Sequence, residues 1–203
     1  MIVEHRGAKP VIDASATIAP GAVISGDVAI GPHTVVLAGA IITAQGAPVR
    51  IGERCVIMEH AVIRGAGIHP CTIADHVLIG PHSHVTGASI GPQCFIATGA
   101  AVFNGAALEE GTVVAIHAVV HISTRCPPST LVPIGHIAFG DPATIYPPDQ
   151  APAFHKAVAA VGFTKTVFGF KAKTLADPEA IKELCDRYAR SLSRHQEDRV
   201  MEE

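Results

Sequence analysis

The sequence contains no tryptophan, and aromatic residues make up only 4% of its 203 residues. A hydrophobic core without large rings must be filled by valine, isoleucine, leucine and alanine. The hydrophobic fraction of 48% shows that such residues are plentiful. This composition favours thin, regular layers of aliphatic side chains. The length suits one domain with a real core and a small terminal addition.

The sequence also lacks a strong charge, a long apolar run and an apolar leader. A formal net charge of −3 gives no electrostatic reason to expect nucleic acid or an anionic membrane as a partner. No stretch is long and apolar enough to cross a bilayer, and residues 1–10 do not form a secretory signal. The five cysteines are scattered without CxxC spacing, as is typical of free thiols in a reducing compartment. These features predict a cytoplasmic protein.

What the sequence has instead is a six-residue repeat. An aliphatic residue recurs at every sixth position from Ile12 to Val120, with short interruptions at 43–50 and 65–72. A small residue often stands four positions after it, as Ala61 follows Ile57. Because side chains alternate along a strand, both positions point to the same side of the chain. Each unit is therefore one short strand and one turn, with both residues inward.

Three such units make one triangular coil, and the coils stack at the interstrand spacing of about 4.8 Å. The repeat therefore predicts a parallel β-helix of about six coils over residues 12–120. We place the β-helix domain in residues 1–148, with residues 137–145 as a closing coil or strap. The same register predicts that Cys55 and Cys94 are small core thiols.

The periodicity changes after residue 148. Residues 152–161 are expected to form a short helix, and a longer one begins where Asp177 and Pro178 supply a cap and a first turn. An apolar stripe follows on that second helix, formed by Ile181, Leu184, Tyr188 and Leu192. We expect residues 149–203 to be a helical segment that packs on the β-helix, with a frayed tail after His195.

Several segments resemble the γ-class carbonic anhydrase-like family of the hexapeptide-repeat transferase superfamily. Residues 51–64 follow a family segment that ends in Ile-His, and residues 74–91 follow one that carries two more histidines. Residues 132–143 resemble the closing GxPAK element of the family. The resemblance implies a left-handed parallel β-helix with a C-terminal α-helix, a homotrimer, and, in active members, a zinc or similar metal held between subunits by three histidines.

The histidines of that resemblance do not carry over. Their positions are occupied by Arg64, Pro81 and Thr86, and the Gln-Asp pair before the first histidine becomes Met58 and Glu59. Neither arginine nor proline can ligate Zn²⁺. The ordinary zinc hydroxide is therefore not expected at these positions.

The register places other polar residues next to those positions. His60 is expected to stack on His82, with His84 one strand step away, which is a three-histidine metal set between subunits. Glu59 would be a further ligand or a proton acceptor. Arg64 would offer a fixed positive charge to a carboxylate, bicarbonate or phosphate. The alternative interpretation is that these side chains are exposed corner residues or packing groups.

Three functions remain open. The first is a carbonic anhydrase-like, metal-dependent lyase acting on a small carboxylate or a CO₂/bicarbonate-like substrate at the His60, His82 and His84 site. The second is a non-catalytic binding or scaffold trimer. The third is coenzyme A-dependent acyl transfer, which the short excursions at 43–50 and 65–72 favour less.

Overall fold

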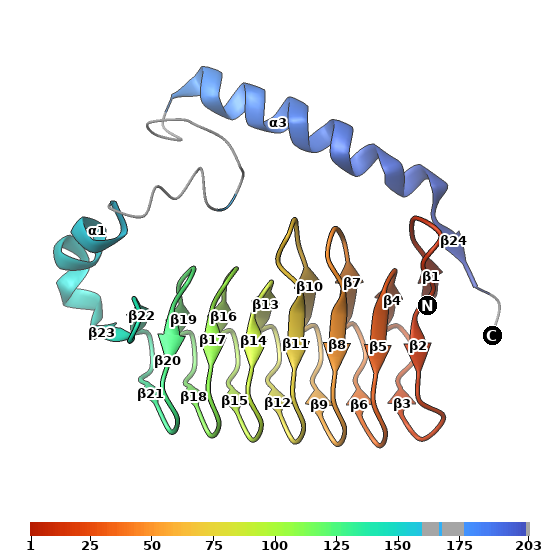
Figure 1. Cartoon of the computed structure of the whole chain (residues 1–203), viewed down its shortest axis with the longest axis horizontal. Helices are drawn as coiled ribbons and strands as arrows, with labels where there is room; N and C mark the ends of the chain where they lie inside the picture. Colours follow the sequence, from red (N-terminus) through yellow and green to blue (C-terminus); the bar gives the residue numbers. More distant parts are fainter. Residues whose placement is uncertain (160–166, 168–176, 202–203) are drawn as a thin grey trace.

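The six-residue repeat folds into short parallel strands that stack in three sheets around a narrow aliphatic core (Figure 1). The computed structural model describes residues 1–159, 167 and 177–201. Sheet 1 has ten strands, and sheets 2 and 3 have seven each. Short turns join each strand to the next sheet, so that three strands make one coil. The fold is the left-handed parallel β-helix that the family resemblance implied.

The strands are two to four residues long, because each six-residue unit must also contain a turn. The parallel strands of sheet 1 are β1 (Ile2–Glu4), β4 (Val23–Ser25), β7 (Ile41–Ala44), β10 (Val62–Gly65), β13 (His84–Thr86), β16 (Ala101–Val102), β19 (Val119–Val120) and β22 (Ile137–Phe139). Those of sheet 2 are β2 (Val11–Ile12), β5 (Val28–Ile30), β8 (Val49–Ile51), β11 (Cys71–Ile73), β14 (Ser89–Ile90), β17 (Ala107–Leu108) and β20 (Arg125–Cys126). Those of sheet 3 are β3 (Thr17–Ile18), β6 (Val35–Val36), β9 (Val56–Ile57), β12 (Leu78–Ile79), β15 (Phe95–Ile96), β18 (Val113–Val114) and β21 (Leu131–Val132).

Identical positions of successive coils lie in register, so the inward aliphatic residues form three columns. In sheet 1 Ile42 pairs with Ile63, and Ile63 with Val85. All three side chains are completely buried. Burial of one such side chain is worth about 1.5–3 kcal/mol. The columns therefore supply most of the core without any large aromatic ring. Cys55 and Cys94 lie in this core, as predicted.

The β-helix is longer than the predicted span of about six coils. It makes seven complete coils and part of an eighth, because β1 adds to sheet 1 at one end and β20 to β22 add a coil at the other. Cys126 pairs with Leu108 in the inward column of sheet 2, and Ala138 follows Val120 in sheet 1. Both are fully buried. The repeat thus continues past residue 120, with Cys126, Val132 and Ala138 as its inward residues. The predicted closing segment, residues 137–145, contains β22 and the start of the strand that folds back on it.

The two interruptions of the repeat are loops that project at one corner, after β7 and β10 (Figure 1). In the second loop Ala66 and His69 exchange two backbone hydrogen bonds of 3.0 and 2.9 Å. The loops therefore have defined shapes and extend beyond the outer surface of sheet 1.

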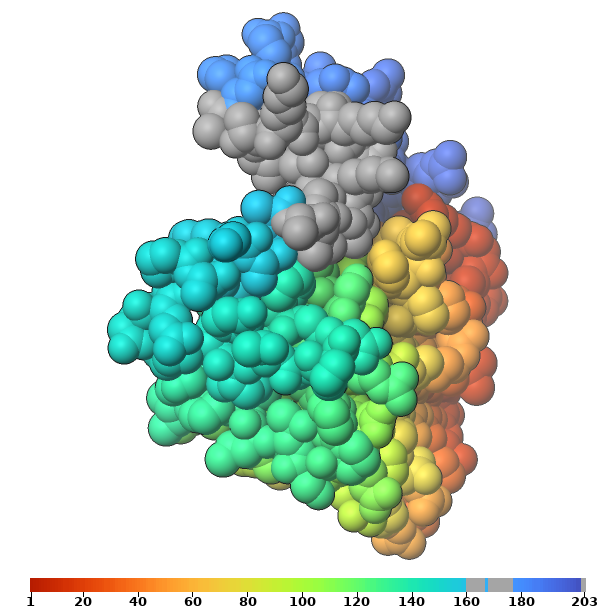
Figure 2. Space-filling model, turned by 60° about the vertical axis from the view of Figure 1, so that its left-hand side comes forward, coloured from red at the N-terminus to blue at the C-terminus, as the bar shows by residue number. Residues whose placement is uncertain are grey.

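At the C-terminal end of the stack the chain turns back as β23 (Thr144–Tyr146), which pairs antiparallel with β22. The 3₁₀-helix η1 (Pro148–Gln150) leads into α1 (Ala151–Ala159), which lies over the last coils (Figure 2). Phe154 of α1 stands edge-on to the rings of His121 and Phe139, at centroid distances of 5.4 and 6.1 Å. The predicted first helix is therefore present, and the end of its predicted range lies outside the described residues.

The second helix, α3 (Pro178–Leu192), begins as predicted. Asp177 caps it by accepting a hydrogen bond of 3.1 Å from the backbone N–H of Glu179. The helix runs back along the stack toward the N-terminal coil (Figure 1). Among the described residues no helix has the length and apolar character needed to cross a membrane. The division of the chain at residue 148 remains a prediction.

The prediction of a frayed tail after His195 is wrong. The 3₁₀-helix η2 (Ser193–Glu197) leads into β24 (Arg199–Val200), which pairs antiparallel with β1. The edge of sheet 1 would otherwise expose unpaired backbone N–H and C=O groups, and a short antiparallel strand covers them. The two ends of the chain therefore lie side by side.

Candidate functional site

His60 and His82 stack at one corner of the β-helix, as the register predicted. Their ring centroids are 5.1 Å apart and the ring planes differ by 10°. A Cβ atom added to Gly39, one coil earlier, would collide with the ring of His60. The His60 ring is thus held between Gly39 and His82, and both histidines are exposed at their outer edges. This arrangement gives the two rings a packing role.

The backbone explains why the sequence has as many as 12 histidines. Histidine is one of the few residues with a side chain that is enriched at positive φ. The corners of the coils need this conformation repeatedly, and five histidines adopt it with φ of 54–58°, namely His33, His60, His76, His82 and His117. Much of the histidine content therefore reflects turn geometry.

His84 is separated from the corner pair. It lies on the outer surface of sheet 1, in register with Val62, and its ring centroid is 6.0 Å from that of Phe103. Among the described residues, His5, His195 and Asp198 form the group of possible metal ligands whose ligand atoms all lie within 4.8 Å of one another. One chain therefore does not gather His60, His82 and His84 into a compact ligand set.

Arg64 and Thr86 lie side by side on the same outer surface, because β10 and β13 pair in register. Nη2 of Arg64 donates a hydrogen bond of 2.5 Å to Oε1 of Gln45. Thr86 is buried, and Pro81 lies on the turn before β13. None of these three side chains offers an imidazole or carboxylate, so the positions assigned to zinc ligands by resemblance do not fit a zinc ion.

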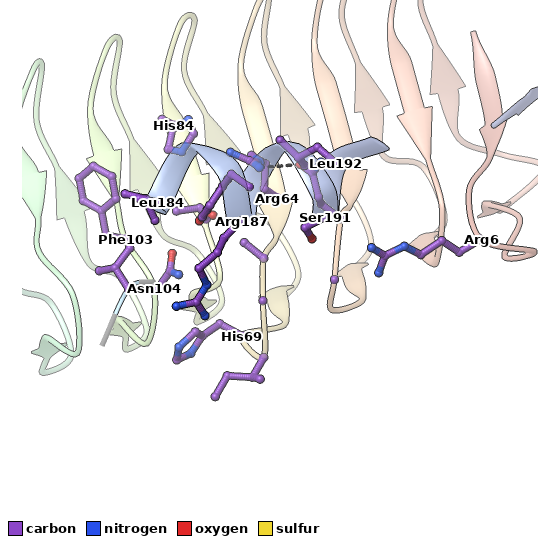
Figure 3. Close-up of a pocket in the computed structure, with 18 residues that line it drawn as sticks. Arg6, Arg64, His69, His84, Phe103, Asn104, Leu184, Arg187, Ser191 and Leu192 are labelled. Carbon is purple, nitrogen blue, oxygen red and sulfur yellow. Dashed lines mark hydrogen bonds between the residues drawn. The ribbon is translucent and has the colours of Figure 1, made fainter. Parts of the chain in front are cut away.

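A pocket of about 780 Å³ lies between the outer surface of sheet 1 and α3. Arg64, His84 and Thr86 form its floor, and Phe103 and Asn104, which directly follow β16, extend the floor. The loop of residues 66–69 forms one wall. The opposite wall is α3, where the pocket is lined by Leu184, Arg187, Tyr188, Ser191 and Leu192 (Figure 3). Three residues of the predicted apolar stripe therefore face this pocket.

The charged groups of the pocket are cationic. Arg6, Arg64 and Arg187 line it, and none of the described lining residues carries a carboxylate. In Figure 3 Arg187 reaches from α3 toward the loop that carries His69, while Arg6 lies toward the N-terminal end of the pocket. Burial of the ring, followed by the nearby charge of Arg64, holds the pKa of His84 below its usual value. His84 is therefore mainly neutral at pH 7, and the arginines give the pocket its charge.

The pocket includes some of the predicted site residues and not others. Arg64 and His84 line it. Glu59 is exposed at the corner, where its backbone carbonyl accepts a hydrogen bond of 3.0 Å from the N–H of His82. Sequence reasoning missed Arg187, although it stands three residues after Leu184, on the same helix face as the apolar stripe.

Comparison with known proteins gives γ-class carbonic anhydrases among the relatives. The chain is 29% identical over 140 residues to mitochondrial γ carbonic anhydrase 1 of Arabidopsis thaliana. The aligned segment covers 66% of this chain and 49% of that protein. The chain is 32% identical over 111 residues to a carbonic anhydrase of Geobacillus kaustophilus, covering 55% of this chain and 61% of that one. The chain thus spans about half the length of the curated relatives it matches. No family model matches the sequence.

A solved structure gives the same fold. The hexapeptide transferase family protein of Anaplasma phagocytophilum superposes with a TM-score of 0.56 at 23% identity, over 84% of this chain and 98% of that one. At this identity the likeness concerns the fold alone. The sequence relatives and the β-helix fold together fit a γ-carbonic anhydrase-like hexapeptide-repeat protein.

Proposed function

We propose that the pocket between sheet 1 and α3 binds a small oxyanion, such as bicarbonate or a short carboxylate. The observation that carries this proposal is the presence of three arginines, Arg6, Arg64 and Arg187, in a pocket whose described lining has no carboxylate. Several positive charges in a concave, partly apolar site favour an anionic ligand.

Arg64 is the residue best placed to orient such an anion. Its hydrogen bond to Gln45 uses one N–H group and fixes the side chain, which leaves other N–H groups of the guanidinium for the ligand. A planar guanidinium matches a carboxylate or bicarbonate through two parallel hydrogen bonds. Arg187 approaches the pocket from α3, so an anion would be held between the β-helix and the helix.

His84 adds the means to move a proton. Because its pKa is lowered, the ring is a neutral imidazole at pH 7 and has one nitrogen that accepts a proton. On this proposal, His84 takes a proton from, or returns one to, a water or acid bound beside Arg64. This chemistry uses residues of the chain alone and does not need a zinc ion at positions 64, 81 and 86.

The test is calorimetric titration with bicarbonate, acetate and inorganic phosphate. Wild-type protein should bind at least one of them, and Arg64→Gln should weaken binding about 10-fold or more, since a charged hydrogen bond contributes about 1.5–3 kcal/mol. Arg54→Gln is the matched control, because Arg54 is exposed on a turn outside the pocket. Equal binding by Arg64→Gln and wild type, or no binding by wild type, would reject the proposal.

We also propose that the chain assembles as a homotrimer. A metal bound by His60, His82 and His84 would need ligands from a second subunit, since one chain does not gather all three. Sedimentation equilibrium tests the assembly, with a mass of three chains of 21.0 kDa as the expected result. A monomer at all concentrations would exclude both the trimer and an intersubunit site.

A non-catalytic binding role is the second candidate. It is favoured by Arg64, Pro81 and Thr86, which stand where the family resemblance assigns histidines. The two candidates differ in turnover. Stopped-flow measurement of CO₂ hydration that is lost in His84→Gln would support an enzyme, whereas anion binding without hydration would support the binding role.

A further inference from the structure

A second polar cluster lies outside the pocket, where the C-terminal segment meets the first coil. It consists of His5, directly after β1, His195 in η2, and Asp198, which precedes β24. His5 is 3% exposed, so this polar side chain is enclosed by the junction. The sequence places the two histidines far apart, and the pairing of β24 with β1 brings them together.

The geometry of the cluster is compact. Nδ1 of His5 lies 2.5 Å from one carboxylate oxygen of Asp198, and Nδ1 of His195 lies 2.7 Å from the other. The two imidazole rings are stacked, with centroids 4.5 Å apart. The three ligand atoms all lie within 4.8 Å of one another. Two imidazole nitrogens thus flank one carboxylate, each beside its own oxygen.

We propose that His5, His195 and Asp198 bind a divalent transition-metal ion, of which Zn²⁺ is the expected type, and that this ion fastens the C-terminal segment to the first coil. The donor set selects the class of metal. Imidazole nitrogen suits zinc, cobalt, nickel and copper, whereas calcium and magnesium prefer oxygen ligands. Three protein ligands leave a fourth position for water. The ion would bridge residues from the two ends of the chain.

Hydrogen bonding connects this cluster to the pocket. Gln45 contacts both Nε2 of His195, at 2.7 Å, and Nη2 of Arg64. Arginine only donates, so the Gln45 oxygen faces Arg64 and its NH₂ group donates to His195. Nε2 of His195 is therefore an acceptor, and the ring proton sits on Nδ1, where it is donated to Asp198.

Metal binding reverses this arrangement. A metal on Nδ1 of His195 places the remaining ring proton on Nε2, which then faces the Gln45 NH₂ group. The amide must rotate, and Arg64 loses its hydrogen bond to Gln45. The metal would thereby free one more N–H group of Arg64 toward the pocket, so occupancy of the cluster and anion binding would be coupled.

The surroundings of His5 set an upper bound on the affinity. Nε2 of His5 is buried and has no hydrogen-bond partner among the described residues. A metal on Nδ1 would leave a proton on this nitrogen without an acceptor. Loss of such an outer partner lowers metal affinity about 10- to 100-fold. We therefore expect weaker binding than at a site whose outer ring nitrogens both have an acceptor.

The test uses the full-length protein after treatment with a chelator. Equilibrium dialysis against ZnCl₂, followed by elemental analysis, should find one zinc per chain in wild type. His195→Ala and Asp198→Asn should each bind zinc about 10-fold more weakly or worse. Both side chains lie outside the β-helix core, and the circular dichroism spectrum of each variant verifies its fold.

The His60→Ala/His82→Ala double variant is the control, because it removes the other histidine pair and should bind zinc as wild type does. Hydrogen exchange gives an independent readout: zinc should slow exchange at β24 in wild type and not in His195→Ala. Zinc binding that persists unchanged in Asp198→Asn and His195→Ala, or that disappears with His60 and His82, would overturn the proposal. So would wild-type protein that takes up no zinc during dialysis.

Discussion

The β-helix and the C-terminal segment are held in place by different means. In the coils a residue's position in the six-residue unit decides whether its side chain is inward, outward or at a corner. The described part of the C-terminal segment has few buried side chains: in α3 it is Ala180 that is buried. Its position depends on strand pairing and on polar contacts such as those of His195 and Asp198. Histidines therefore have packing roles in the coils and polar partners at the junction.

The largest effect is expected at a corner of the coils. Gly39→Ala should lower the free energy of unfolding by about 3 kcal/mol, because the residue has φ of 73° and its new Cβ would meet the His60 ring. Gly67→Ala is the matched control: φ is also positive there but no atom lies within 4 Å of the added Cβ. It should cost only about 1 kcal/mol.

Urea unfolding measures both variants. In Gly39→Ala/His60→Ala the collision is absent, so most of the difference from Gly67→Ala should disappear. If the double variant is as unstable as Gly39→Ala, the His60 ring does not pack as described and the corner has another role.

The next largest effect is a difference in reaction rate between the thiols of the two regions. Cys185 of α3 is exposed, whereas the four cysteines of the coils are buried. Burial raises the pKa of Cys71 to about 12 and that of Cys126 to about 11. In native protein at pH 8, a disulfide reagent should react with one thiol at least about 100-fold faster than with the rest, because the thiolate is the reactive form.

The Cys185→Ser variant should lack this fast phase, and unfolding in guanidinium chloride should release all five thiols of wild type. Two or more fast thiols in native wild type would mean that the coils open more readily than their packing indicates.

The smallest effect concerns pH, at the surface where the two regions meet. The pKa of His84 is lowered, first by burial and then by Arg64, so the protonated ring is disfavoured in the folded state. The contribution of His84 to stability is therefore complete above about pH 6.5, and it is lost as the pH falls through the lower folded-state pKa. The loss should be about 0.5 kcal/mol, since the ring is only half-buried.

Unfolding curves at pH 7.5 and 5.5 measure this loss, and His84→Gln should reduce the difference between them. Arg64→Gln should raise the pKa of His84 in a nuclear magnetic resonance titration, because one of the two causes is removed. If the pKa of His84 does not change in Arg64→Gln, the two side chains do not interact and the described pocket geometry is wrong.

Sequence reasoning predicted the coils well because their side chains obey a local rule. The six-residue register predicts the inward columns. It also predicts the stack of His60 on His82 and the alignment of Arg64 with Thr86. The same rule carried the continuous repeat only to Val120, because Cys126 occupies the next inward position where an aliphatic residue was expected. The end of the last coil was predicted separately, as a closing coil or strap over residues 137–145.

The pocket and the metal cluster could not be predicted in this way. Arg187 lines the same pocket as Arg64, and His195 stacks on His5, only because α3 and β24 fold back along the stack. No local period relates these residues. The abundance of histidine was also misleading, because a histidine at a left-handed corner and one beside a carboxylate look alike in the sequence.

The most direct test of the central claim, that the pocket rather than the histidine corner is the functional site, is a nuclear magnetic resonance titration of histidine-labelled protein with bicarbonate at constant pH. The account predicts that the ring signals of His84 and His69, which line the pocket, shift on saturation, while those of His60 and His82 do not. Shifts confined to His60 and His82 would contradict it and would show that the anion binds at the histidine corner.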